Sequence, residues 1–201
     1  MNPVRNSWKT TCLAGLLMFS ATFAVAEAID RPMIKAGDRW KYETRDGYTN
    51  LITAETERVI TIVGDTQIDA TENGGKATFS REMNAIETPE FKYEPTSSAL
   101  KFPFDVGSKW SWEGKVLVKG SGITARNQYE VTVVGKEPIT VKAGTYDTYK
   151  LIMEGFISTN TTRAFTRTYW YSPKARGFVK VLNDDKRNPW TMEMLDIKLE
   201  P

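Results

Sequence analysis

The chain has 201 residues, of which 40% are hydrophobic, 26% charged and 11% aromatic, with 27 basic and 25 acidic side chains. This composition is typical of a globular protein and excludes collagen-like, coiled-coil and fully disordered classes. The chain contains no histidine, which excludes Ser-His-Asp and Cys-His catalysis and histidine-ligated metal sites.

Residues 1–26 have the pattern of a secretory signal peptide. Two basic side chains precede an apolar stretch at residues 11–23, which is too short for a comfortable membrane span, and small residues at 24–26 match what a signal peptidase reads. We expect cleavage before Glu27, with a cut two residues later as the alternative. The protein is therefore expected to be exported, to the periplasm or the extracellular space.

Removal of this leader changes the charge and the cysteine count. It takes away two of the 27 basic side chains and none of the 25 acidic ones, so the mature chain has a formal net charge of zero. It also removes Cys12, the single cysteine, so a disulfide cannot contribute to stability. A neutral surface of this kind does not favour nucleic acid as a partner. We expect one domain over residues 27–201, stabilised by its core.

Alternation of apolar and polar residues runs through the mature chain, without a sustained helical period. Turn sequences such as Asn-Gly-Gly at residues 73–75 separate the alternating runs. Short connections between such runs indicate hairpins, so we predict an all-β fold of roughly eight to twelve antiparallel strands, as a curled sheet, half-barrel or barrel-like sandwich. A helical turn is expected at most near residues 95–100. The predicted core residues are Trp40, Tyr42, Trp110, Trp112, Val131, Val133, Tyr149 and Leu151.

A faint internal duplication divides the mature chain. Residues 35–43 align with 105–113, residues 58–64 with 129–135, and residues 91–95 with 169–173, in the same order. These matches predict pseudo-repeats over about residues 35–95 and 105–173, joined by residues 95–104. The alternative is that each match describes only a strand that starts after a turn.

The last predicted strand, residues 190–199, changes register. Three apolar residues up to Met194 share one face, and three from Leu195 onwards share the other. A strand cannot present both sets to one core unless an extra residue shifts the phase. We therefore predict a β-bulge near Met194 and Leu195, or a strand that passes from one sheet layer to another.

Aromatic side chains at alternate strand positions are the strongest indication of function. Large rings commonly fill the space between curled sheets. They can also line a cavity for an apolar or amphipathic ligand. The candidate ligand-binding residues are Trp40, Tyr42, Trp110 and Trp112.

A second candidate site is a stripe of alternating arginine and aromatic residues. Its members Arg163, Phe165, Arg167 and Tyr169 share one face of a predicted strand. We interpret this face as an outer one, on a strand that could lie at a sheet edge. Because arginine and tyrosine are enriched at binding hot spots, the stripe is a candidate protein interface.

Catalysis would depend on carboxylates, since histidine and mature cysteine are absent. Two acidic residues that flank a sugar could act as acid and base. The candidates occupy polar strand faces or turns, where solvated carboxylates are the default: Glu113, Asp147, Glu154, Asp184 and Asp185. No metal-ligand spacing is present. We therefore expect no catalytic residues, no metal site and no cofactor, and predict that the protein is not an enzyme.

Three stretches resemble a family. They are residues 141–150, residues 169–173 followed by 177–180, and residues 102–110. Together they resemble a group of uncharacterised secreted bacterial β-proteins, a domain-of-unknown-function family that includes TapB-like proteins, over residues 102–181. The usual proline before the Ala-Gly turn is Lys142 here. The resemblance implies an envelope location and an all-β fold, and it assigns no site residues.

The sequence therefore predicts a non-catalytic exported envelope protein that binds an apolar or amphipathic envelope ligand in an aromatic-lined β scaffold. The alternative is an interaction or structural module whose partner is another envelope protein. A carboxylate-dependent hydrolase is the least favoured possibility.

Overall fold

Alternating residues form strands throughout residues 28–201, the part of the chain that the computed structural model describes. The first six strands are β1 (Arg39–Asp46), β2 (Ile52–Val63), β3 (Gln67–Glu72), β4 (Gly75–Ser80), β5 (Ala85–Glu87) and β6 (Phe91–Glu94). The last six are β7 (Lys109–Val118), β8 (Ile123–Val141), β9 (Gly144–Ser158), β10 (Thr162–Ser172), β11 (Gly177–Asp184) and β12 (Trp190–Lys198). The expected signal peptide lies outside the described residues.

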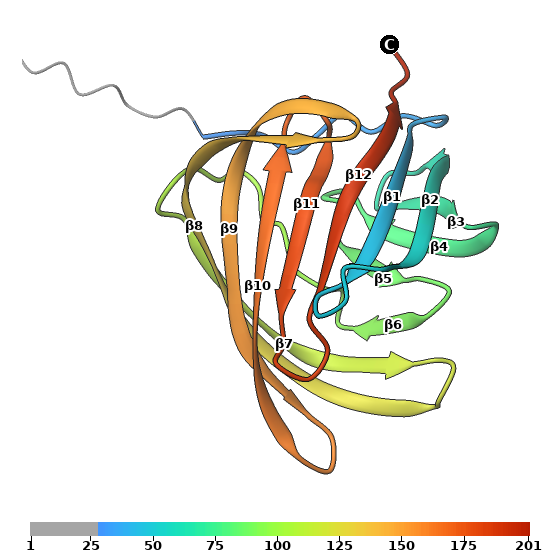
Figure 1. Ribbon diagram of the computed structural model, residues 1–201. Coiled ribbons are helices and arrows are strands. Elements are labelled where there is room, and N and C mark those ends of the chain that lie inside the picture. Colours follow the sequence, from blue (N-terminus) through green and yellow to red (C-terminus); the bar gives the residue numbers. More distant parts are fainter. Residues whose placement is uncertain (1–27) are drawn as a thin grey trace, which may run out of the picture.

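Each strand pairs antiparallel with the next, and β1 pairs with β12 to close the sheet into a barrel (Figure 1). The prediction of an all-β antiparallel fold is confirmed, and closure explains why no strand is left at an edge. In particular, β10 lies between β9 and β11, so the expectation that the arginine-aromatic strand lies at a sheet edge is wrong.

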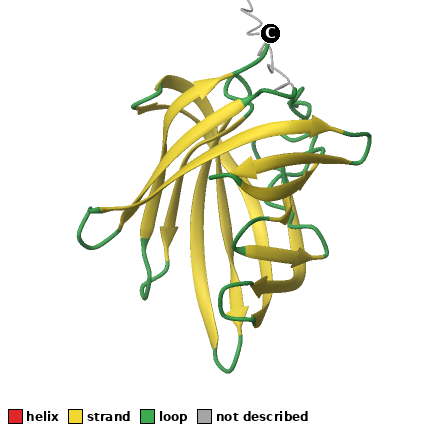
Figure 2. Cartoon of the chain, turned by 90° about the vertical axis from the view of Figure 1, so that its right-hand side faces the viewer, coloured by secondary structure: helices red, strands yellow, loops and turns green. Residues whose placement is uncertain are grey.

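Helices are absent from residues 28–201 (Figure 2). The helical turn expected near residues 95–100 is therefore wrong, because this segment is held by side-chain hydrogen bonds instead of by its own backbone. No helix in the described part of the chain is long and apolar enough to cross a membrane.

The predicted bulge in the last strand is confirmed. Lys41 of β1 faces Asp196 of β12, but the next residue, Tyr42, faces Met194, so Leu195 is the extra residue. The phase shift lets Met194 and Ile197, which lie on opposite sides of the bulge, pack into the same apolar cluster. One added residue thus lets the whole strand face a single interior.

Two apolar clusters fill the barrel. One is built around Trp112, Val131 and Leu151, and the other around Trp40 and Met194. All the predicted core residues are buried, in one cluster or the other: Trp40, Tyr42, Trp110, Trp112, Val131, Val133, Tyr149 and Leu151. The clusters are rich in rings because a barrel of twelve strands leaves a wide interior that small side chains cannot fill.

The segment between β6 and β7 packs apolar side chains into the barrel interior. Its residues Leu100 and Phe104 are each only 1% exposed. The indole nitrogen of Trp110 donates a hydrogen bond to the carbonyl oxygen of Ser98 (2.8 Å), and that of Trp112 donates to the carbonyl oxygen of Thr96 (2.7 Å). These bonds satisfy carbonyl groups that have no strand partner, so the segment can pack against the barrel without leaving these groups unpaired.

The predicted duplication has a partial counterpart at the starts of β1 and β7. Gly37 and Gly107 precede these strands with φ values of 95° and 92°. Each glycine donates a backbone hydrogen bond to the following long strand, Gly37 to Ile60 (2.9 Å) and Gly107 to Val133 (2.8 Å). However, residues 91–95 comprise the whole of the short strand β6 and the residue after it, while 169–173 comprise the end of the long strand β10 and the residue after it, so the aligned pairs do not all occupy equivalent strands. The duplication stays a prediction.

Candidate functional site

A cavity of about 180 Å³ lies between the two apolar clusters. Its walls come from both clusters and are mostly aromatic and sulfur-containing: Trp40, Tyr42, Phe79, Met83, Tyr93, Leu100, Tyr129, Met153, Tyr169, Phe178 and Met192. An engineered cavity of about 150 Å³ accepts benzene, whereas drug-sized ligands occupy about 300–1,000 Å³. The cavity therefore suits a small apolar body, or one part of a larger molecule.

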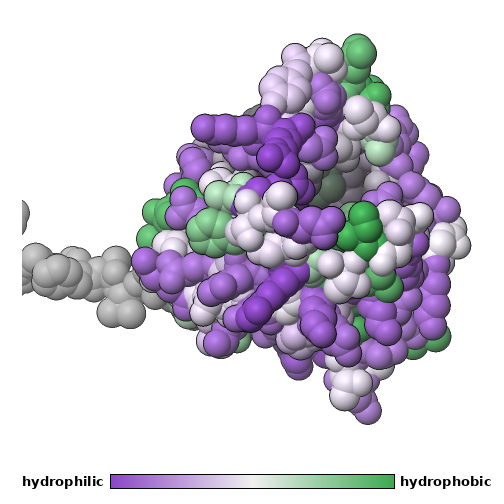
Figure 3. All heavy atoms as spheres, turned by 90° about the horizontal axis from the view of Figure 1, so that it is seen from below, coloured by the Kyte–Doolittle hydropathy of each residue, from purple (hydrophilic) through white to green (hydrophobic). Residues whose placement is uncertain are grey.

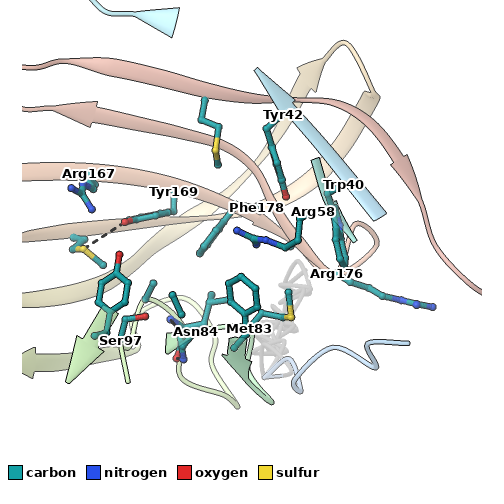
Figure 4. Close-up of a pocket in the computed structure, with 18 of the residues that line it drawn as sticks. Trp40, Tyr42, Arg58, Met83, Asn84, Ser97, Arg167, Tyr169, Arg176 and Phe178 are labelled. Carbon is teal, nitrogen blue, oxygen red and sulfur yellow. Dashed lines mark hydrogen bonds between the residues drawn. The ribbon is translucent and has the colours of Figure 1, made fainter. Parts of the chain in front are cut away.

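The cavity extends along the barrel, and a different arginine lies at each of its two ends. Figure 4 shows Arg176 on one side of the pocket and Arg167 on the other, with Arg58 and Phe178 between them. Arg167 pairs with Asn183, which in turn pairs with Trp190, the first residue of β12. Arg167 thus lies toward the lower end of the barrel, which is hollowed near its centre when seen from below (Figure 3).

Arg176 lies at the upper side of the cavity and forms an ion pair with Asp38. Its Nη1 lies 3.0 Å from a carboxylate oxygen of Asp38, which is fully buried. The same carboxylate accepts hydrogen bonds from the backbone N–H groups of Lys35 (2.9 Å) and Glu200 (2.8 Å). Asp38 therefore ties the turn before β1, the β10–β11 turn and the C-terminal segment together, and the charge of Arg176 is compensated.

Arg58 is also compensated. Its Nε donates a hydrogen bond to Glu72 on the neighbouring strand (2.8 Å), and its guanidinium lies 4.4 Å from the centre of the Phe79 ring. The ion pair and the ring contact hold this side chain against the cavity wall. It contributes a flat polar surface to the cavity without a net charge.

Arg167 differs from the other two arginines. Among residues 28–201 no aspartate or glutamate forms an ion pair with it. Its Nε donates to the side-chain oxygen of Asn183 (2.8 Å), and its guanidinium lies 5.1 Å from the ring centre of Phe165 and 5.7 Å from that of Trp190. Burial lowers the pKa of Arg167, but the surrounding tyrosines, Tyr169 foremost, raise it above its ordinary value. The side chain therefore remains a cation.

The tyrosines of the cavity are neutral at ordinary pH. Burial raises the pKa of Tyr42 to about 12 and that of Tyr93 to about 12. Burial also raises the pKa of Tyr129, whose hydroxyl accepts a hydrogen bond from the backbone N–H of Ser98 (3.0 Å). Tyrosinate is therefore not available near neutral pH to balance the charge of Arg167.

Two of the four predicted ligand-binding residues line the cavity, and two do not. Trp40 and Tyr42 line the cavity, whereas Trp110 and Trp112 are not among its lining residues. Trp112 stacks on Tyr129 with ring centres 5.1 Å apart, and both tryptophans use their indole N–H groups to hold the segment that forms one wall. Trp110 and Trp112 thus hold one wall of the cavity in place without lining the cavity themselves.

The arginine-aromatic stripe does not lie on an outer face, and this expectation is wrong. Phe165 and Tyr169 are 4% and 8% exposed and belong to the core. Arg167 and Tyr169 line the cavity, while Arg163 forms an ion pair with Asp185 (2.8 Å). The register of β10 explains this result, because Tyr171 occupies the same face and is fully buried. Binding of a protein partner by the stripe remains a prediction, without the exposed face and free edge that motivated it.

None of the candidate catalytic carboxylates lines the cavity: Glu113, Asp147, Glu154, Asp184 and Asp185. Asp185 is buried against Arg163, and Glu113 forms an ion pair with Arg126 on the outer surface. Within residues 28–201 there is no group of three acidic or other metal-binding side chains that could hold a metal ion.

Several cavity residues were not predicted from the sequence. Arg58, Asn84 and Arg176 lie on β2, in the β4–β5 connection and in the β10–β11 turn, and only closure of the barrel brings them together. For Arg167, the sequence did contain an indication of an inward-facing position. It shares a strand face with Phe165, Tyr169 and Tyr171, and a face with three rings is more consistent with the interior than with solvent.

Solved structures with the same fold come from bacteria. A protein classed as a lipoprotein from Parabacteroides distasonis superimposes with a TM-score of 0.61 at 15% identity, covering 85% of this chain and 99% of the other. A protein classed as exported, with a YmcC-like fold, from Bacteroides fragilis gives 0.56 at 15% identity with the same coverage. The hypothetical lipoprotein YmcC from Escherichia coli gives 0.50 at 11% identity, covering 82% and 85%.

These similarities concern the fold. No protein-family model and no curated protein sequence matches the chain. The expected likeness to bacterial all-β proteins is thus supported, but nothing supports the TapB-like group in particular. The chain has the closed-barrel fold of its YmcC-like structural neighbours.

Proposed function

We propose that this protein is a non-catalytic exported protein that binds an apolar or amphipathic molecule inside its barrel. The observation that carries the proposal is the cavity between the two apolar clusters, lined by aromatic and methionine side chains with three arginines. Concave, largely apolar sites with a few polar groups are the usual form of small-molecule sites. Methionine adapts its shape to irregular ligands, which suits a site that accepts flexible chains.

An envelope location is part of this proposal. It is supported by the signal-peptide pattern of residues 1–26 and by the structural neighbours, two of which are classed as lipoproteins and one as exported. Lipids and their fragments are abundant in that compartment, so an apolar cavity would meet ligands there.

Native mass spectrometry of the mature protein, purified from its own host without detergent, tests the proposal directly. We expect an adduct that is lost on denaturation. In parallel, the apolar dye N-phenylnaphthylamine should gain fluorescence when it enters the cavity. If neither an adduct nor a gain in fluorescence is observed, ligand binding in the cavity is contradicted.

A pair of variants localises the binding. Ala99 lines the cavity, so Ala99→Phe should fill part of the space and reduce dye binding at least about fivefold. Ala54 lies exposed on β2, so Ala54→Phe adds the same ring outside the barrel and should leave dye binding unchanged. Circular dichroism of both variants confirms that the fold is retained. Equal dye binding by the two variants would place the dye elsewhere.

A further inference from the structure

We infer that the ligand carries a single anionic head group, and that Arg167 binds this group at the lower end of the cavity while the apolar body lies toward Phe178 and Phe79. This inference rests on the proposed function. It adds the charge of the ligand and its orientation in the barrel.

Arg167 carries an uncompensated charge. It is partly buried in the barrel wall, and its closest partners are the Asn183 amide, the Tyr169 hydroxyl and the rings of Phe165 and Trp190. Among residues 28–201 it has no acidic partner. Partial removal of a charge from water without an opposite charge is costly, because the attraction of dipoles and rings replaces only part of its lost hydration. An anion supplied by a ligand would remove this cost.

The neighbouring arginines differ from Arg167 in having acidic partners. Arg176 is paired with Asp38, and Arg58 with Glu72. Arg163 occupies the same face of β10 as Arg167, four residues earlier, and is paired with Asp185. Within residues 28–201, the fold therefore supplies a carboxylate to each of these three arginines and none to Arg167.

The guanidinium of Arg167 is held in a geometry that suits an anion. The ε nitrogen of Arg167 is held by Asn183, which fixes the guanidinium plane, and the hydroxyl groups of tyrosines lie around it. The remaining N–H groups of a guanidinium match the two oxygens of a carboxylate or a phosphate. Beyond Arg167 the cavity is lined by Met153, Phe178 and Phe79, and by Arg58, whose charge is balanced by Glu72. The unpaired charge of Arg167 thus lies at one end of a largely apolar cavity, which matches an amphipathic anion.

The cavity volume limits the size of the ligand. About 180 Å³ accommodates a ring or a short alkyl chain. Octanoate is therefore a suitable probe, because it combines a carboxylate with a flexible apolar chain. Octan-1-ol has the same chain without the charge, octylammonium reverses the charge, and octyl phosphate tests the other anionic head group.

Affinity is measured by displacement of N-phenylnaphthylamine from the mature protein at low ionic strength. We expect octanoate or octyl phosphate to bind at least about tenfold more tightly than octan-1-ol, and octylammonium to bind most weakly. The preferred anion identifies the source as a fatty acid or a phosphorylated lipid fragment. The inference is overturned if octan-1-ol binds as tightly as both anions.

Three variants assign the preference to Arg167. Arg167→Gln should weaken the binding of octanoate and octyl phosphate at least about tenfold, and so abolish the preference for anions over octan-1-ol. Arg163→Gln, the matched control on the same strand face, should retain the preference. Arg167→Lys keeps the charge but loses the forked geometry, so we expect an intermediate preference. A preference that survives unchanged in Arg167→Gln would overturn the assignment.

Thermal melting gives an independent readout. Octanoate should raise the melting temperature of the wild type and of Arg163→Gln, but not that of Arg167→Gln. The outcomes also separate the two proposals. Displacement by octan-1-ol as strong as by the anions would contradict only the anionic head group, whereas an absence of dye and probe binding would contradict the ligand-binding function itself.

Discussion

The side chain of Asn84 forms two hydrogen bonds with the backbone of Leu100: its Nδ2 donates to the carbonyl oxygen (2.7 Å), and its Oδ1 accepts from the N–H group (2.9 Å). This arrangement copies the pairing of one β-strand with another, although Leu100 belongs to no strand. Both residues are almost fully buried and both line the cavity. Asn84 thus fixes the position of the segment between β6 and β7, which forms one wall of the cavity.

Replacement of Asn84 tests this role. Asn84→Ala leaves the buried N–H and C=O groups of Leu100 without partners, so we expect the free energy of unfolding to fall by about 2–4 kcal/mol. Urea denaturation of the mature protein measures the change. Asn160→Ala, in the exposed β9–β10 turn, is the control and should change it by less than about 0.5 kcal/mol. Equal effects of the two substitutions would contradict the role.

The buried Asp38–Arg176 ion pair should be strongly coupled. Asp38→Ala leaves the guanidinium of Arg176 without its carboxylate partner and two backbone N–H groups without their acceptor, so we expect the free energy of unfolding to fall by about 3–5 kcal/mol. Lys198→Ala, which breaks the exposed pair with Glu200, should cost less than about 1 kcal/mol. A double-mutant cycle with Arg176→Met measures the coupling. Additive effects in that cycle would show that the pair does not act as a unit.

Stability should fall in strong alkali because of Tyr42. Burial raises the pKa of Tyr42 from 10.0 to about 12 in the folded protein. Its contribution is therefore fully present below about pH 10, and it is lost as the pH rises from about 10 to about 12, because the unfolded chain releases the proton first. Two pKa units correspond to about 3 kcal/mol.

Denaturant unfolding at about pH 8 and about pH 11 measures this loss, with tyrosinate absorbance as the titration signal. Tyr42→Phe should show a smaller fall in stability between the two pH values than the wild type. Tyr48, which is 69% exposed, provides the control, and Tyr48→Phe should retain the wild-type fall. If Tyr42→Phe behaves like the wild type, the burial of this hydroxyl does not control alkaline stability.

Close approach of β8 and β9 requires a glycine at position 155. A Cβ atom at Gly155 would overlap the backbone carbonyl oxygen of Gln128 and lie 2.6 Å from the Cβ of Tyr129. Because backbone atoms cannot move aside cheaply, Gly155→Ala should destabilise the protein by at least about 2 kcal/mol. A thermal melt followed by circular dichroism provides the measurement.

Gly135 is the matched control on the same strand pair. A Cβ atom there would meet no other atom within 4 Å, so Gly135→Ala should be neutral or slightly stabilising. A lower melting temperature for Gly135→Ala than for Gly155→Ala would contradict the steric explanation.

Local alternation was sufficient to predict the all-β fold and, on β1, β7, β8 and β9, residues that face inward. Alternation at Trp110 and Trp112, or at Val131 and Val133, has a period of two, and a side chain's face follows directly from that local rule. The bulge at Leu195 was predictable for the same reason, because a break in the alternation is visible in one strand alone.

Which faces enclose the cavity, and which charges remain unpaired, depends on long-range strand pairing. Arg58 and Asn84 line one cavity with Arg167 because β1 and β12 close the barrel, a contact between the two ends of the chain. The assignment of Arg167 to an outer face was wrong because Phe165 and Tyr169, on either side of it along β10, are buried, and Arg167 between them is partly buried as well. Local pattern fixes the direction of a side chain, but its partners depend on long-range strand pairing, which the local pattern does not contain.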